Sequence, residues 1–478
     1  MPYIAKLEKA GIPTVTIDFA DQLEMIKQEG LVHGFPNVRV VHASRTLPGP
    51  EDVDRILEPI IEALTRPLTK KEKKGGKWAP EQKKVFFKGT LDEAEKFYQQ
   101  TKEIPFPVNA PIAVYTDGLP ITVPTEERVR EMLTGTSHKP DELITYPFTL
   151  PPQRGRERNK GEPVLFQPMN LTATVEKVAI NAVMAGCLPE QLPVVLAIAQ
   201  SECGTGTTNF PSQAVCLSGP IVKELKMNTG VGVLGPGSVA NGPIGRAYQL
   251  MAINLGGAVP GLNRMGSLGN PLNNGGMCFA ENAEGLPPGW KGLNEEHGNS
   301  KEESIVMVIN AGGGVQGSQF SPGGYRAFQK SGHGGMARRF DVKGKPGPHN
   351  WLEYLVPSLW ATREGAYTFI MVPEMARHLY DYGFKSKDEV YEWLWKKCLE
   401  PLKDYRNRSW PDRSTNGWLG IEKTSGKPWK ELSDDYLIPL INDPFDSIII
   451  VAGGEEEACV QLGGGREMSG VFSIDAWR

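Results

Sequence analysis

Two cysteines, Cys187 and Cys203, stand where the sequence favours a reactive thiol. Cys187 lies between two predicted helices and directly before the second, where unpaired backbone amides and the helix dipole favour a thiolate. Cys203 follows the second helix in a polar loop. A free cysteine also packs as a small hydrophobic side chain, so a structural role is the alternative for both. Cys187 is our first candidate for a nucleophile or a redox thiol.

Carboxylates and one histidine are candidates for proton transfer. Glu281 follows a glycine-rich stretch, and Glu176 lies in the first turn of a predicted helix. Either side chain can act as a general acid or base, although a surface position is commoner for a carboxylate and Glu176 also complements the helix dipole. His333 lies between glycines, which let a ligand approach the backbone closely. A surface loop has the same pattern.

A glycine-rich loop before a predicted helix is a candidate anion site. The helix is expected to start with Asn241 as its N-cap. Backbone amides around Gly235, Gly237 and Asn241 would then meet at a helix N-terminus, which binds carboxylates and phosphates. The loop contains the pattern G-x-G-x-x-G, but a helix is predicted before it, whereas a dinucleotide fingerprint follows a strand.

Arg246 lies in or next to the first turn of that helix, where the dipole disfavours a cation. A bound anion would explain the arginine, and so would a salt bridge to Glu281 or Glu176. Asn181 is a further substrate-binding candidate on an earlier helix. It lies five residues after Glu176, about 140° around that helix, so at most one of the two faces a given pocket.

The elements that position these residues alternate between strand and helix. Residues 13–19 and 38–42 are predicted strands, with helices over 21–30 and 51–64. We therefore expect an α/β protein. A small Rossmann-like domain covers residues 1–104, a proline-rich extended arm covers 105–162, and a large glycine-rich α/β domain covers 163–478.

Two apolar runs in the large domain predict strands that are buried on both faces. They cover residues 304–309 and 446–452, and glycines follow each run. Ligands of open α/β sheets bind at the carboxyl ends of the strands, so these glycines are candidate walls of a binding site.

Composition excludes several classes of function. The chain has 478 residues, of which 40% are hydrophobic and 23% charged, as in folded multidomain proteins. Its 52 basic and 56 acidic residues form no sustained basic surface, so nucleic acid is not an expected partner. No apolar run has membrane-spanning length and no leader pattern stands at the N-terminus, so we expect a cytoplasmic protein without membrane contact.

Six scattered cysteines and seven histidines show neither C-x-x-C nor H-E-x-x-H spacing. We therefore expect reduced thiols and no zinc site, and the sequence identifies no cofactor.

Four segments carry a resemblance to a known family: Thr174-Val-Glu-Lys-Val-Ala-Ile-Asn-Ala-Val-Met-Ala-Gly-Cys187, Asn241-Gly-Pro-Ile-Gly-Arg-Ala, Ala280-Glu-Asn-Ala-Glu and Val372-Pro-Glu-Met-Ala. The chain resembles a bacterial family linked to the UGSC proteins. In that family a long domain accompanies a smaller α/β domain named for a Sec/Cys-Gly-Ser-Cys tetrapeptide. The segment from Gly11 resembles the later half of the smaller domain, but the tetrapeptide is absent. Either a second subunit supplies it or this branch uses different chemistry.

Three functional hypotheses follow. The first is an enzyme that acts on a small anionic metabolite, with Arg246 binding the anion, Cys187 as thiolate or redox partner, and Glu281 or Glu176 transferring protons. The resemblance implies oxidoreductase chemistry or cleavage of a carbon–heteroatom bond. The second is a cysteine-independent lyase or hydrolase that uses carboxylate and histidine. The third is a non-catalytic subunit that completes a partner carrying the redox motif. We expect a homo-oligomer or a complex with a second subunit, because an incomplete small domain leaves a sheet edge uncovered.

Overall fold

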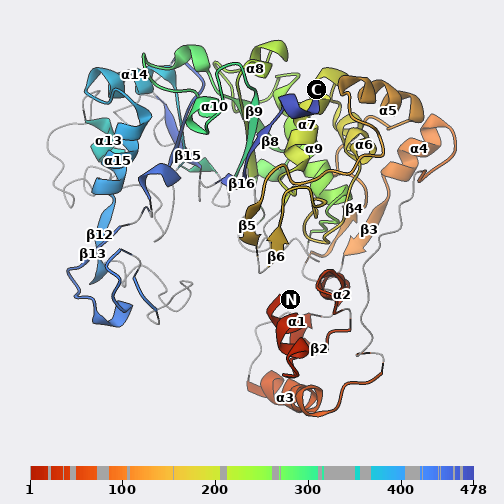
Figure 1. The fold of residues 1–478 in the computed structure, drawn as a ribbon. Coiled ribbons are helices and arrows are strands. Elements are labelled where there is room, and N and C mark those ends of the chain that lie inside the picture. Colours follow the sequence, from red (N-terminus) through yellow and green to blue (C-terminus); the bar gives the residue numbers. More distant parts are fainter. Residues whose placement is uncertain are drawn as a thin grey trace.

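The computed structural model describes most of the chain, namely residues 2–19, 23–35, 37–43, 50–70, 72, 85–104, 108–153, 156–204, 213–260, 269, 271–310, 315–316, 350–355, 368–403, 420–422, 424–439, 441, 443–455, 458–462 and 467–478. Helices combine with small mixed sheets, which makes the chain an α/β protein. Figure 1 shows an N-terminal unit at the bottom and, above it, two groups of helices on either side of the central strands.

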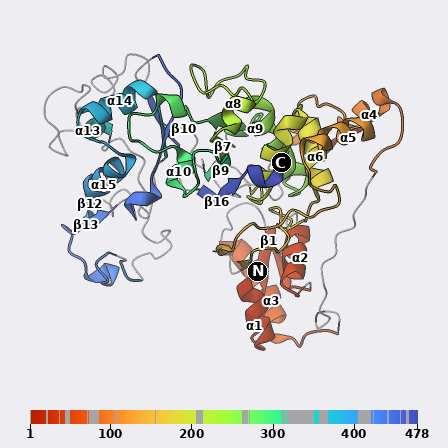
Figure 2. The same cartoon turned by 45° about the horizontal axis from the view of Figure 1, so that its top comes forward.

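The N-terminal unit contains the predicted order of strand, helix, strand and helix. Its elements are α1 (Pro2–Lys9), β1 (Thr16–Phe19), α2 (Leu23–Val32), β2 (Val40–Ala43) and α3 (Pro50–Thr65). The two strands are parallel, with Thr16 opposite Val40. Figure 2 shows α1, α2 and α3 beside β1.

The segment expected to be an extended arm packs instead against the large body. Its elements, together with those just before it, are α4 (Leu91–Tyr98), β3 (Thr101–Ile104), β4 (Ala110–Ala113), α5 (Glu126–Met132), β5 (Leu150–Gln153) and β6 (Arg156–Arg158). The boundary expected after residue 104 falls within the antiparallel β3–β4 pair. Val129, Met132, Ile144 and Tyr146 belong to the main hydrophobic core, and their burial holds the segment in place.

Two four-stranded sheets form the centre of the large body. The first has the order β16-β9-β7-β8, with β7 (Gln213–Ser218), β8 (Met277–Ala280), β9 (Ile305–Asn310) and β16 (Glu467–Ser473). The second has the order β10-β15-β11-β14, with β10 (Val315–Gln316), β11 (Thr368–Met371), β14 (Ile448–Val451) and β15 (Cys459–Leu462). The strands predicted over 304–309 and 446–452 are present as β9 and β14.

The two sheets have the same internal pattern. In each, one parallel pair (β7 with β8, β11 with β14) is followed by an antiparallel neighbour, β9 or β15. The backbone nitrogen of Glu281 donates to Leu217 O, and the nitrogen of Ala452 donates to Met371 O in the same way. The fourth strands are exchanged, because β10 follows β9 but pairs with β15, and β16 follows β15 but pairs with β9. The exchange ties the two halves together.

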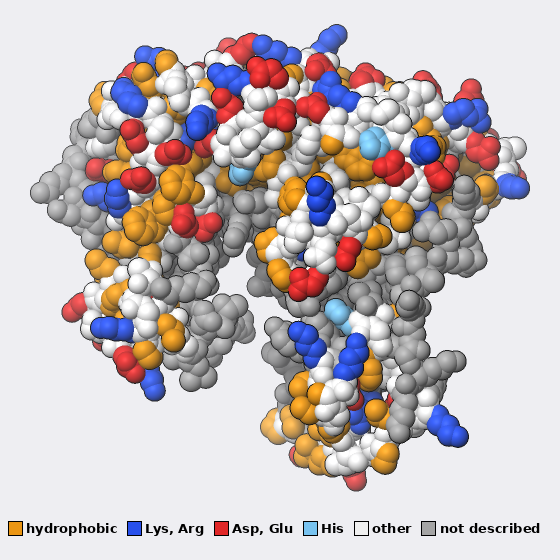
Figure 3. Space-filling model, in the orientation of Figure 1, with side chains coloured by type: hydrophobic (Ala, Val, Ile, Leu, Met, Phe, Trp, Pro, Cys, Tyr) orange, Lys and Arg blue, Asp and Glu red, His pale blue; other side chains and the backbone are white. Residues whose placement is uncertain are grey.

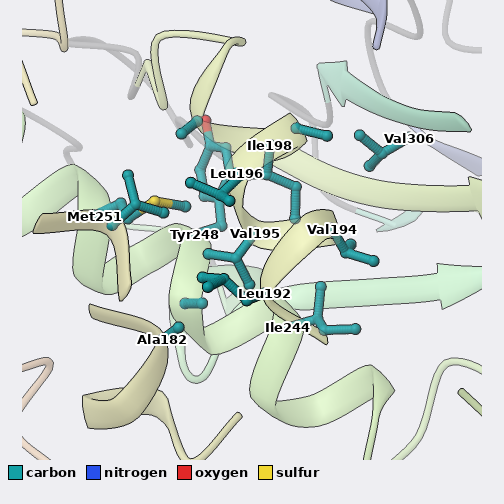
Figure 4. Close-up of a cluster of buried hydrophobic side chains, with 14 of the residues drawn as sticks. Ala182, Leu192, Val194, Val195, Leu196, Ile198, Ile244, Tyr248, Met251 and Val306 are labelled. Carbon is teal, nitrogen blue, oxygen red and sulfur yellow. The ribbon is translucent and has the colours of Figure 1, made fainter. Parts of the chain in front are cut away.

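Alternation of side chains along the strands produces four layers. Cys216, Phe279, Ile370 and Ile450 meet between the sheets. The helices α6 (Val175–Ala185), α7 (Leu192–Ala199) and α9 (Asn241–Asn254) pack on the outer face of the first sheet, where Figure 4 shows their core. The helices α13 (Trp351–Leu355), α14 (Pro373–Asp381) and α15 (Lys387–Lys397) pack on the outer face of the second sheet.

Smaller elements complete the large body. They are α8 (Ile221–Glu224), α10 (Leu293–Glu296) and the antiparallel pair β12 (Leu399–Pro401) and β13 (Leu437–Pro439). Over the residues that the structure describes, every helix is too short or too polar to cross a lipid bilayer.

Candidate functional site

A buried polar cluster lies at the carboxyl ends of the parallel strands β7 and β8. Ser218 is the last residue of β7, and Glu281 directly follows β8. The Glu281 carboxylate accepts hydrogen bonds from Ser218 Oγ at 2.8 Å and from the backbone nitrogen of Leu293, the first residue of α10, at 2.7 Å. Its side chain is 0% exposed. Ligands of α/β proteins bind at this end of a sheet, which makes Glu281 the first site candidate.

Lys387 connects Glu281 to a second carboxylate. Lys387 Nζ lies 3.3 Å from Glu281 Oε1 and 2.6 Å from Glu296 Oε2. Tyr391 donates from its hydroxyl to Glu296 Oε1 at 3.0 Å and accepts from the backbone nitrogen of Ile449 in β14 at 3.0 Å. We call Ser218, Glu281, Glu296, Lys387 and Tyr391 the Glu281 cluster. It contains two carboxylates and one ammonium, and it links the first sheet to the second.

The electrostatics of the cluster follow from burial and close contact. Burial raises the pKa of Glu296, and the Lys387 ammonium offsets only part of this rise. Burial by itself lowers the pKa of Lys387, but the carboxylates of Glu281 and Glu296 outweigh it and raise that pKa above its ordinary value. Burial also raises the pKa of Tyr391 well above its ordinary value. Lys387 is therefore charged at neutral pH and is shared by two carboxylates.

Two glycines bring α9 close to β8, the strand directly before Glu281. A Cβ on Gly245 would lie 3.0 Å from the backbone nitrogen of Cys278 in β8. Gly276 has φ +73°, and a Cβ there would lie 2.0 Å from Gly245 O. Only residues without a side chain permit this contact. The glycines thus set the position of β8, and with it that of Glu281.

Reasoning from the sequence found Glu281 but missed its partners. Lys387 is the first residue of α15, and Ser386 caps that helix. A cation in a first helical turn is disfavoured by the dipole, which is the same signal that drew attention to Arg246. The signal was therefore present for Lys387 too. Glu296 and Tyr391 carry no comparable local signal.

Cys187 occupies the predicted turn, but the thiolate expected there is disfavoured. Gly186 ends α6 with φ +84°, and Pro189 begins a short 3-10 helix, so Cys187 lies between two helical elements. The Cys187 side chain lies in the main core, and burial raises the pKa of its thiol to about 12. Burial also raises the pKa of Cys203. The dipole argument fails because desolvation of the charged sulfur outweighs it. All six cysteines are free and buried.

The Arg246 side chain forms hydrogen bonds with residues 117–120, in the segment that was expected to be an extended arm. Its Nε and Nη2 donate to the two carboxylate oxygens of Asp117, both at 2.9 Å. Nη2 also donates to the carbonyl oxygens of Leu119 and Pro120. Arg246 therefore forms a salt bridge, with Asp117 as the partner instead of Glu281 or Glu176. This bidentate pair ties residues 117–120 to α9.

Asn241 is the first residue of α9, and its side chain forms hydrogen bonds with the loop before this helix. The helix begins at Asn241 with Ala240 as its N-cap, so the N-cap expected at Asn241 is wrong by one residue. Asn241 Oδ1 accepts from Ser238 Oγ at 2.7 Å, and Nδ2 donates to Asn228 O at 3.1 Å. Both the oxygen and the nitrogen of the Asn241 side-chain amide are therefore engaged in holding the loop. Gly235 and Gly237 lie in its exposed part, and Gly237 has φ +106°.

The remaining candidates are not members of the Glu281 cluster, and two of them lie on α6. Glu176 lies half-buried in the first turn of α6, as predicted. Asn181 is buried, and its Oδ1 accepts from Asn254 Nδ2 at 2.9 Å, which ties α6 to α9. His333 lies outside the described residues.

No group of three or more His, Cys, Asp or Glu side chains suited to a metal ion occurs in the described ranges. Comparisons with family models, with curated proteins and with solved structures find no match.

Proposed function

We propose that the chain is an enzyme of the lyase or hydrolase type that acts on a small metabolite through acid–base chemistry at Glu281. The supporting observation is the contact of one buried ammonium, Lys387, with the buried carboxylate of Glu281 after β8 and with the partly buried carboxylate of Glu296 in α10. Catalytic acids and bases are commonly found among titratable groups whose surroundings push their pKa values apart. The raised pKa of the Cys187 thiol speaks against the thiol-dependent enzyme, which was the first hypothesis from the sequence.

In this proposal the cluster passes protons between the substrate and solvent. Glu281 is the inner carboxylate and exchanges a proton with the substrate. Glu296, whose side chain is 13% exposed, is the outer carboxylate and exchanges with solvent. Lys387 lies within hydrogen-bonding reach of both. Ser218 and the Leu293 amide hold Glu281 in one orientation. His333 stays a predicted partner for this chemistry.

The substrate class is narrowed by Arg246. Since Asp117 holds the Arg246 guanidinium, this side chain does not favour an anionic substrate, and the cation that pairs with Glu281 is Lys387, at 3.3 Å. The proposed substrate is a metabolite that has a hydrolysable bond or a proton that the Glu281 carboxylate can remove. We further propose that the N-terminal unit is a Rossmann-like domain, that the chain works in the cytoplasm, and that its relation to the UGSC-linked family does not extend to thiol redox chemistry.

Untargeted metabolite profiling tests the proposed activity. The purified chain is incubated with a small-molecule extract, and mass spectrometry follows which compounds disappear and which form. Glu281→Gln keeps the size of the side chain and removes its basicity, so the rate should fall by about 10²–10⁴. Glu284→Gln is the matched control, because Glu284 is exposed and pairs with Lys223 at the surface. A folded Glu281→Gln variant that turns over at the wild-type rate would refute the proposal.

A further inference from the structure

The N-terminal unit exposes several large apolar side chains. Among the side chains that the structure describes in residues 2–70, three apolar ones are buried, namely Ile26, Val41 and Ala63. Six large ones are between 39% and 51% exposed: Leu7, Ile12, Ile17, Val53, Leu57 and Ile61. Parallel sheets are normally covered on both faces, and a two-stranded sheet is marginal alone. This unit therefore has apolar surface to cover.

The helix α3 presents three of these side chains in one row. Val53, Leu57 and Ile61 are spaced by four residues, so they lie on one side of the helix. Figure 3 shows hydrophobic side chains gathered over the lower end of the molecule, where Figure 1 places α3. The row extends over about two turns of the helix, and another element can pack against it.

A row of carboxylates runs beside the apolar row. Asp54, Glu58 and Glu62 each follow one residue after an apolar member, about 100° around the helix. All three are exposed. We call the two rows together the acidic face of α3. An element that covers this face needs apolar side chains with cations beside them.

Residues 6–12 of the same unit have this complementary composition. Leu7 and Ile12 are exposed, and so are Lys6 and Lys9. Glu8 does not cancel the lysines, because its carboxylate pairs with Arg39 at 2.9 Å. We call residues 6–12 the basic segment.

Arg39 holds both surfaces in a defined relation to one another. It pairs with Glu8 in α1, and its Nη1 donates to the carbonyl oxygen of Ala63 in α3. The acidic face and the basic segment are therefore parts of one unit. In a two-fold dimer the acidic face of each copy would therefore meet the basic segment of the other copy.

We propose that two copies of this chain associate through their N-terminal units, with the acidic face of α3 in one copy against the basic segment of the second copy, and the reverse. Such an interface is closed, because residue i contacts residue j and j contacts i. Apolar burial supplies the affinity, and the carboxylate–lysine contacts fix the orientation. This inference concerns assembly and does not depend on the proposed activity.

Sedimentation velocity of the full chain tests the dimer. The wild type should sediment with twice the mass of one chain at micromolar concentration. Leu57→Glu places a charge in the apolar row and should raise the dissociation constant at least about 100-fold, since a buried unpaired charge is costly. Leu437→Glu in β13 is the matched control, because Leu437 is 51% exposed and Leu57 is 48% exposed. The control should remain dimeric.

Charge reversal tests which surfaces meet. The pair Glu58→Lys and Glu62→Lys should weaken the dimer, and so should the pair Lys6→Glu and Lys9→Glu. A chain with all four changes should dimerise again, because opposite charges face each other once more. Circular dichroism of each variant shows whether the chain is folded. A monomeric wild type, a dimer unaffected by Leu57→Glu, or a folded fourfold variant that stays monomeric would overturn the proposal.

Discussion

Replacing Lys387 by methionine removes the ammonium that both Glu281 and Glu296 contact, while it keeps an unbranched side chain of similar length. In the wild type the Lys387 side chain is 2% exposed, and the Glu281 side chain is 0% exposed. The variant therefore leaves two carboxylates in a buried site without a cation. Each carboxylate must then either stay charged at high cost or take up a proton.

The cost can be estimated from the burial of the pair. Removing one partner of a buried ion pair typically costs about 3–5 kcal/mol. At about 2–4 °C for each kcal/mol, the melting temperature of the large body should fall by roughly 10 °C. Lys396→Met is the matched control, because Lys396 pairs with Glu392 on the same helix but both side chains are more than half exposed. That change should cost less than about 1 kcal/mol.

The stability lost in Lys387→Met should depend on pH, and the pKa of Glu296 gives the direction of this dependence. Burial raises the pKa of Glu296, so the folded chain holds this proton more tightly than the unfolded chain does. The stability that this proton contributes is present below the ordinary carboxyl pKa and is lost as the pH rises through the raised value. Lys387 lowers the pKa of Glu296, so its removal raises that pKa further. The difference between wild type and variant should therefore be largest at neutral and higher pH and shrink as the pH falls towards the ordinary carboxyl pKa.

Urea unfolding followed by tryptophan fluorescence at several pH values measures this difference. A loss below about 1 kcal/mol near pH 7 would show that the ammonium does not compensate buried carboxylates. A loss that grows as the pH falls would contradict the sign derived from Glu296.

Three further predictions concern other parts of the large body. Cys187 should react with a thiol reagent at pH 8 far more slowly in the native chain than after unfolding, because burial raises its pKa to about 12; rapid native labelling would contradict this. Asp117→Asn weakens the bidentate contact with Arg246, so it should cost about 1–2 kcal/mol in urea unfolding and speed proteolysis around residue 117; unchanged cleavage would count against this anchor. Gly245→Ala places a Cβ 3.0 Å from a β8 nitrogen and should cost about 1–3 kcal/mol by thermal unfolding, whereas Gly242→Ala on the same helix meets nothing within 4 Å and should not destabilise. Equal effects of the two alanines would refute the close-packing argument.

Local sequence patterns predicted many of the elements. The β-branched runs around Thr16 and Val40 predicted the parallel strands of the N-terminal unit, and near-continuous apolar runs predicted β9 and β14. These features depend on neighbouring residues, whose spacing and backbone freedom are visible in the sequence.

Long-range pairing could not be predicted in this way. Arg246 drew attention because of its position near a helix start, but its partner, Asp117, is 129 residues away. A helical dipole signals that a cation needs a partner without indicating which one. The exchange of β10 and β16 between the sheets is equally invisible, since an apolar strand pattern does not identify the neighbouring strand.

For the candidate site, the sequence by itself determined that Glu281 follows a glycine-rich stretch, because this is a local pattern, whereas the short strand β8 between the two was not predicted. Only the tertiary structure decided that Glu281 is buried against Lys387, 106 residues further along the chain, and that Glu296 shares the same ammonium. It also decided that Cys187 is a core side chain with a protonated thiol. The physical reason is that burial and charge pairing depend on how the helices and two sheets pack together, which no local stretch of sequence encodes.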